Sequence, residues 1–421
     1  MNNFTEKAWY KLDNAAKIFP PTSSKADTRV FRFSCELYEA VDGNMLQSAL
    51  DRTINDFPSF QYVLKHGMFW YYLERSNVRP LAREEDMPPC STIYLNRRAL
   101  LFDVTWYGKR INLEVYHALT DGTGALQFLK MLVLHYLKLA HPDTMDKIVN
   151  IDYDASESQR MTDSFNKYYD KSKNISKSKK NAAYQLKGAK EAEWRLNIIE
   201  GNVSTKALLN KAREYNTTVT IFITALLIRA IYGEMNVRDR KKPVVITVPV
   251  NLRNYFDSKS SRNFFSIIDI RYDFNSKNGT LEDIINCSKE CFDENLNKEY
   301  LQARLNKFLS FERNFLIRLV PLTIKNLYMS IAYSRQAREV TASVSNVGRV
   351  VMPNEAKQYI KLFDVFNSTE KLQLCICSYE DSMNIAFTSP FVSTDIQCCF
   401  FRQLAQMGID IEISANNLRG K

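Results

Sequence analysis

The sequence lacks the features that mark several common classes of protein. None of its eight cysteines belongs to a Cys-x-x-Cys pair or has a histidine close by, so the spaced ligand pairs of a zinc site are missing. No stretch approaches the ~20 apolar residues that a membrane-spanning helix requires. The first residues hold no apolar core of a secretory signal. We therefore expect a cytoplasmic protein without a metal site or membrane span, whose reduced cysteines serve as small buried apolar side chains.

Signs of nucleic-acid binding are also missing. The net charge is +10, with 57 basic and 47 acidic side chains, which favours anionic partners in general. However, the chain has neither a zinc pattern nor a segment in which basic and aromatic residues alternate, as is typical of nucleic-acid readers. We expect no nucleic-acid partner.

What is present is enough apolar sequence for two cores. A chain of 421 residues, 45% of them hydrophobic, exceeds the size at which a single core stops growing. We divide it into an N-terminal lobe (1–150), a polar, lysine-rich connection (151–193) and a C-terminal lobe (194–421). Strand and helix patterns occur in both lobes, which predicts an α/β (α+β) fold of mixed sheets flanked by helices. The β-branched run at 244–250 is typical of a strand buried on both faces.

Histidine is scarce, and one of the four histidines stands out. His117 continues the apolar face of a predicted strand over 111–117, and Asp121 and Gly122 follow it. Imidazole exchanges a proton near neutral pH more readily than any other side chain, so His117 is a candidate general base. The alternative is a core histidine satisfied by hydrogen bonds. His66 is predicted in a turn, and His135 and His141 at the surface.

Three other features have two interpretations each. Asp121 either caps the helix that follows it or forms an ion pair with a distant residue. Arg253 is a surface residue, or it needs a partner because it follows a buried strand directly. The apolar segment 315–333, which carries Arg318 and Lys325, forms a packed helix pair or lies on a membrane surface.

Four ordered segments together resemble the chloramphenicol acetyltransferase-like superfamily, which includes nonribosomal peptide condensation domains and alcohol O-acetyltransferases. The first is His117 with Asp121 and Gly122. The second is Pro-Val-Asn-Leu-Arg at 249–253, followed by Arg-Asn-Phe-Phe at 262–265. The third is the predicted helix that starts at Thr218, and the fourth is Ser-Asn-Val-Gly at 345–348. The sequence departs from the pattern at Tyr116, where many condensation domains have another histidine, and it lacks the Asp-Phe-Gly-Trp-Gly signature of plant-type acyltransferases.

The resemblance implies two similar lobes with an active-site tunnel between them. It implies that His117 is the general base for an acceptor that attacks a thioester. Asp121 would then be structural, paired with Arg253 across the lobes, and Gly122 would leave room for backbone and substrate. Ser345 and Asn346 are candidates for the oxyanion or substrate contact.

The resemblance further implies an acyltransferase of the alcohol O-acetyltransferase type, which transfers groups other than amino-acyl groups. Acyl-CoA is the favoured donor, as a co-substrate and not a permanently bound cofactor, and the acceptor is a small-molecule alcohol or amine. A carrier protein is the other donor to consider. The alternative function is a non-catalytic or carrier-protein-dependent condensation-like protein that binds acyl thioesters or a protein partner.

Overall fold

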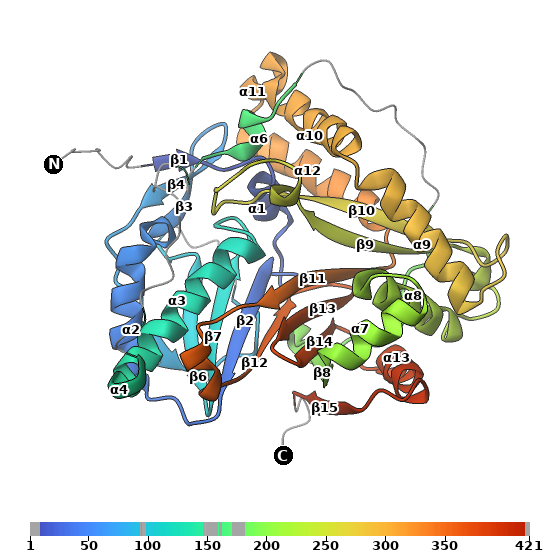
Figure 1. The fold of residues 1–421 in the computed structure, drawn as a ribbon. Coiled ribbons are helices and arrows are strands. Elements are labelled where there is room, and N and C mark those ends of the chain that lie inside the picture. Colours follow the sequence, from blue (N-terminus) through green and yellow to red (C-terminus); the bar gives the residue numbers. More distant parts are fainter. Residues whose placement is uncertain are drawn as a thin grey trace.

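The computed structural model describes residues 9–92, 94, 98–145, 148, 159, 162–170 and 182–416. Within these residues the chain forms mixed α/β structure, with sheets flanked by helices (Figure 1). A five-stranded sheet has the order β12-β2-β7-β6-β5, and a seven-stranded sheet has the order β10-β9-β11-β13-β14-β8-β15. A small third sheet has the order β1-β4-β3. The α/β prediction with mixed sheets is confirmed.

The first lobe is built on the five-stranded sheet. Its strands are β2 (Val30–Leu37), β5 (Ala82–Glu84), β6 (Phe102–Tyr107), β7 (Arg110–Tyr116) and β12 (Ile360–Asn367). The small sheet beside it contains β1 (Trp9–Lys11), β3 (Tyr62–His66) and β4 (Tyr71–Arg75). The helices are α1 (Phe19–Thr22), α2 (Gly43–Asp56), α3 (Gly122–Ala140) and α4 (Pro142–Met145).

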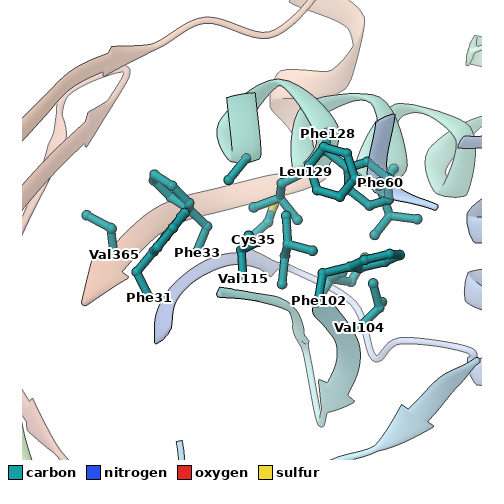
Figure 2. Packing of buried hydrophobic residues seen from close by; sticks show 14 of the residues in the cluster. Phe31, Phe33, Cys35, Phe60, Phe102, Val104, Val115, Phe128, Leu129 and Val365 are labelled. Carbon is teal, nitrogen blue, oxygen red and sulfur yellow. The ribbon is translucent and has the colours of Figure 1, made fainter. Parts of the chain in front are cut away.

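Aromatic and aliphatic side chains fill the space between this sheet and α3. Figure 2 shows Phe33 and Val115, from neighbouring strands, below Phe128 and Leu129 of α3. Phe60 and Phe128 stack with ring centroids 4.2 Å apart. Residues on both faces of β7 are buried, so the strand that leads to His117 is enclosed by the core.

The second lobe is built on the seven-stranded sheet. Its strands are β8 (Asn197–Ser204), β9 (Val244–Asn251), β10 (Phe265–Tyr272), β11 (Ala342–Val350), β13 (Leu372–Tyr379), β14 (Ser382–Ser389) and β15 (Ile411–Ala415). Its helices are α7 (Thr205–Glu214), α8 (Val219–Gly233), α9 (Leu281–Asn295), α10 (Lys298–Arg313) and α13 (Asp395–Gln406). Two more helices, α11 (Phe315–Leu319) and α12 (Leu322–Ala337), follow α10, and α12 contacts α1 of the first lobe. The run at 244–250 is predicted to be buried on both faces, but in β9 this holds only for residues 244–246. Beyond them buried and partly exposed residues alternate.

One strand departs from the predicted division of the chain. β12 lies within the segment assigned to the C-terminal lobe, yet it pairs antiparallel with β2 of the first sheet. The predicted connection also contains packed structure where it is described: in α6 (Ser164–Lys167), Phe165 is buried and contacts Phe264 at a centroid distance of 5.2 Å. Ala183 and Tyr184 of the same connection are also buried, whereas residues 171–181 lie outside the described residues.

Two further expectations are corrected. His135 is buried, not at the surface, because α3 packs against α2, where the Thr53 hydroxyl lies 3.0 Å from His135 Nδ1. Not all cysteines are buried: Cys398 is exposed, and Cys291 and Cys399 are partly exposed. These three lie on α9 and α13, whose outer faces meet solvent.

In the described part of the chain, no single helix is both long enough and apolar enough to cross a membrane. Helices α7 and α8 together meet that length and composition, but they are bent by 79° at their junction. Most of α8 is buried in the core of the second lobe.

Candidate active site

His117 directly follows β7 and is held by its backbone from both sides. Its N–H donates to the carbonyl of Arg29 at 3.0 Å, and its carbonyl accepts from the Asn263 side-chain amide at 3.0 Å. Arg29 has a φ of +61°, a left-handed conformation that costs a non-glycine residue energy and occurs often at functional sites. Because Asn263 belongs to the second lobe, the histidine is fixed where the two lobes meet.

Aromatic rings surround the imidazole. Phe19 stacks on it with a centroid distance of 4.9 Å, and Phe31 lies at 4.4 Å. Phe265 of the second lobe lies at 6.4 Å. The residue is still partly accessible to solvent, whereas its Nδ1 atom is buried without a hydrogen-bond partner of normal geometry. The more accessible nitrogen of the ring is therefore Nε2.

This apolar setting controls the charge of His117. Burial lowers its pKa from 6.5 to about 4, and Asp121 opposes the shift without cancelling it. Arg29 lowers the pKa further, because a nearby cation disfavours a second positive charge. At neutral pH the ring is uncharged and has a lone pair for a proton, which is the state that a general base needs.

Asp121 connects the histidine loop to both lobes. As the N-cap of α3, its Oδ1 accepts from the N–H groups of Thr123 and Gly124 at 3.1 and 3.3 Å. Its Oδ2 accepts from Arg253 Nη1 at 2.7 Å and from the Phe264 N–H at 2.9 Å. The two interpretations of Asp121 thus hold together: the same carboxylate is a helix cap and an ion-pair partner.

Arg253 is enclosed on its other side by backbone. Its Nε and Nη2 donate to the Ser260 carbonyl at 3.0 and 2.8 Å. Two more bonds cross between the lobes nearby: Thr120 Oγ1 donates to the Ser261 carbonyl, and Asn251 Nδ2 donates to Thr123 Oγ1 at 3.3 Å. The loop that carries His117 is therefore fastened to the segment between β9 and β10.

The glycine at which the backbone approaches closely is Gly124, and not Gly122. A Cβ on Gly124 would overlap with Thr120 Oγ1 and the Ser261 carbonyl. A Cβ on Gly122 would meet only Phe33, at an ordinary contact distance of 3.8 Å. Packing within the protein therefore does not require glycine at position 122. The close backbone approach that we expected at Gly122 occurs at Gly124 instead. Whether Gly122 leaves room for substrate stays a prediction.

The described contacts do not bring Ser345 or Asn346 to the imidazole. Asn346 is exposed on β11, where its Nδ2 donates to Thr220 Oγ1 at 2.9 Å and its Oδ1 accepts from the Gly348 N–H at 2.8 Å. The parallel register of β11 with β9 directs this bulged segment toward the end of β9 that carries Asn251. Their oxyanion role stays a prediction.

Sequence reasoning missed a buried carboxyl near the site. Asp13 accepts from Asn263 Nδ2 at 3.2 Å, and burial raises its pKa to about 6 despite nearby Arg262. The same amide group of Asn263 also donates to His117. Phe19 was missed as well. The only sequence feature that pointed to these contacts was the segment 262–265, which contains Asn263. Nothing in residues 13–19 indicates a contact with His117, about a hundred positions away.

A surface hollow lies elsewhere, lined by residues 202–204, 381–382 and 410–412. It is at the edge of the seven-stranded sheet formed by β8 and β15, and no histidine lines it. The elements that surround His117 do not line this hollow either, so it is separate from the candidate active site. The tunnel between the lobes stays a prediction.

No protein-family model matches the sequence, and no curated protein matches it either. Solved structures do match along nearly the whole chain. TRI3 trichothecene 15-O-acetyltransferase from Fusarium sporotrichioides is 10% identical over 94% of each chain, with a TM-score of 0.65. TRI101 from F. graminearum, solved with coenzyme A and T-2 mycotoxin, is 10% identical over 96% of this chain and 99% of its own, with a TM-score of 0.62. The first condensation domain of the calcium-dependent antibiotic synthetase is 13% identical over 96% of this chain and 99% of its own, with a TM-score of 0.63.

These similarities concern the fold. The chain has a two-lobed fold that it shares with an acetyltransferase and a condensation domain. The resemblance predicted from the ordered motifs is confirmed at this level.

Proposed function

We propose that this protein is an acyltransferase that moves an acyl group from acyl-CoA to a small-molecule alcohol or amine, with His117 as the general base. The observation that carries the proposal is the imidazole itself, uncharged, partly accessible and fixed between the lobes. The fold is one that acetyltransferases use, and the net charge of +10 suits a donor that bears phosphates.

The reaction follows from the accessible nitrogen. Nε2 takes the proton from the acceptor hydroxyl or amine as its oxygen or nitrogen attacks the thioester carbonyl. The tetrahedral intermediate then collapses, the carbon–sulfur bond breaks, and the imidazolium returns the proton to the leaving thiolate. The products are an ester or amide and free coenzyme A. Asp121 and Arg253 do not touch the reacting atoms in this scheme; they are positioning residues that hold the histidine loop against the second lobe.

Release of free thiol tests the proposal. Purified protein is incubated with acetyl-CoA and longer acyl-CoA donors and a panel of alcohols and amines. We expect thiol release that falls by ~10²–10⁴-fold in His117→Ala, because a positioned base contributes about that much. His66→Ala is the matched control, because His66 is exposed at the end of β3, and we expect it to retain both rate and stability.

Two outcomes contradict the proposal. Normal turnover in a folded His117→Ala variant would remove the histidine from the mechanism. Binding of acyl-CoA without any thiol release would favour the non-catalytic function instead.

A further inference from the structure

The apolar side chains of α12 face outward. Ile324, Leu327, Tyr328 and Ile331 follow the i, i+3, i+4, i+7 spacing that normally marks a face turned to the core. Here they are exposed, Leu327 by 64% and Tyr328 by 70%. No residue of α11 or α12 is buried. The two helices predicted over 315–333 are present, and they contact α10 and α1, but their apolar stripe is not covered by the described residues.

The inner side of α12 fixes its orientation. The Leu322 N–H donates to the Met68 carbonyl at 2.8 Å, and Asn326 Nδ2 donates to Tyr71 Oη at 2.8 Å. One turn from the end of the helix, the Arg29 guanidinium lies over the Tyr333 ring at 4.4 Å. Because these anchors hold the inner face, rotating the helix to bury its outer stripe would break all three.

Neighbouring side chains extend the stripe into a surface. Phe315 and Leu316 of α11 are exposed by 70% and 73%, and Met68, adjoining the start of α12, is exposed by 73%. We call the whole set the α11–α12 surface; it comprises Met68, Trp70, Phe315, Leu316, Leu319, Ile324, Leu327, Tyr328 and Ile331. Exposed apolar side chains in this number, on two consecutive helices and the adjoining segment at 68–70, are typical of an interaction site.

The charged residues within the helical segment that carries this surface have one sign. Between Arg313 and Arg338 the sequence has five basic residues and no acidic one. Arg318, Arg335 and Arg338 are exposed, and the Lys325 ammonium lies over the Trp70 ring at 5.9 Å. An occupant of the surface must therefore accept apolar side chains at its centre and cations at its margin.

We propose that the α11–α12 surface docks on an anionic lipid bilayer. Helices with exposed Phe, Leu and Tyr beside arginines are typical of segments that lie in the plane of a membrane interface. Lipid tails would cover the apolar side chains, anionic headgroups would face the arginines, and Trp70 and Tyr328 suit the boundary between them. This proposal goes beyond acyl transfer and does not depend on it.

The docking surface adjoins the candidate active site. Figure 1 shows α12 beside α1, and the two helices are in contact. Phe19 of α1 stacks on His117, and Arg29, which faces Tyr333 of α12, accepts the hydrogen bond from the His117 N–H. A bilayer on this surface would therefore lie next to α1, whose Phe19 covers one face of the imidazole.

Vesicle flotation tests the proposal without any turnover. The intact protein is mixed with phosphatidylcholine vesicles that contain either no anionic lipid or about one third phosphatidylserine. We expect flotation with the anionic vesicles, weakened by high salt. Leu327→Ser/Ile331→Ser should reduce partitioning by at least ~10-fold, because each leucine or isoleucine loses most of its transfer to the apolar phase.

Matched variants keep the result specific. Val237→Ser/Ile413→Ser alters two exposed apolar residues elsewhere and should leave flotation unchanged. Arg335→Glu/Arg338→Glu should abolish flotation with anionic vesicles, whereas Arg229→Glu/Arg402→Glu, with the same change of charge on α8 and α13, should not. Absence of flotation by the wild type, equal flotation of surface and control variants, or self-association through this surface without vesicle binding would overturn the proposal.

Discussion

Arg253 and Asp121 form an ion pair across the two lobes, with Nη1 and Oδ2 2.7 Å apart and both side chains almost buried, 11% and 7% exposed. Each group also bonds to backbone: the guanidinium to Ser260, and the carboxylate to the first turn of α3 and to Phe264. A buried pair whose remaining donors and acceptors are satisfied is held in one geometry. It positions the loop that carries His117 without touching a reacting atom.

Replacing one member of this pair should destabilise the protein strongly. Asp121→Asn leaves the Arg253 charge buried without a counter-charge, and a loss of about 3–5 kcal/mol in the free energy of unfolding is typical of that change. Urea denaturation measures it. The control is Asp51→Asn, which breaks a pair with Arg79 at the exposed surface and should cost far less. Equal losses in the two variants would show that the cross-lobe pair is not structural.

Two glycines of the same helix turn should respond differently to an added methyl group. Gly124→Ala forces Thr120 and the Ser261 carbonyl apart, and overpacking of this kind costs roughly 1–3 kcal/mol. Gly122→Ala meets only Phe33 at 3.8 Å and should melt at or slightly above the wild-type temperature. Thermal melting decides between them. A larger loss at 122 than at 124 would contradict the structure, and a rate loss in a stable Gly122→Ala variant would indicate substrate contact there.

The pH dependence of the rate should reveal the buried histidine. Because burial lowers the pKa of His117 to about 4, the base stays unprotonated across neutral pH and loses activity only as the pH falls toward that value. We expect kcat/KM to show no inflexion near 6.5 from this group. Ring resonances in NMR, assigned by comparison with His117→Ala, measure the same pKa directly. A His117 resonance that titrates near 6.5 would contradict the buried, neutral state.

A second titrating cluster should make stability depend on pH. Arg110 lies 2.9 Å from Glu36 and Asp364 and 3.3 Å from Glu200, so one cation serves three carboxylates, of which Glu36 also pairs with Lys361. Burial, followed by repulsion from Asp364, raises the pKa of Glu200 from 4.5 to about 7.

Because the folded state then binds the extra proton at Glu200, the contribution of this group to stability is fully present below pH 4.5. It declines as the pH rises from 4.5 to 7, by up to about 1.4 kcal/mol per pH unit. Glu200→Gln cannot ionise and should flatten this decline, so that it is more stable than the wild type at pH 8. Urea denaturation at pH 5 and pH 8 provides the comparison. A variant that is less stable at both values would argue against repulsion in the cluster.

The part of the site that could be predicted is the part encoded by short segments. The strand that ends at His117, the cap at Asp121 and the helix that follows depend on neighbours within a few residues, and the spacing of apolar residues reports them directly. Asp13, Phe19 and Asn263 could not be assigned in this way, because each reaches the histidine or its partner from a distant part of the chain.

By itself the sequence determined the α/β class, most of the strands and helices, and the resemblance carried by ordered motifs, because these depend on local periodicity and residue identity. Only the tertiary structure decided which face of each element is covered. It moved β12 into the first sheet, buried His135 and left the apolar stripe of α12 exposed. Periodicity shows that a helix has an apolar face, but whether protein, lipid or water meets that face depends on where distant segments pack.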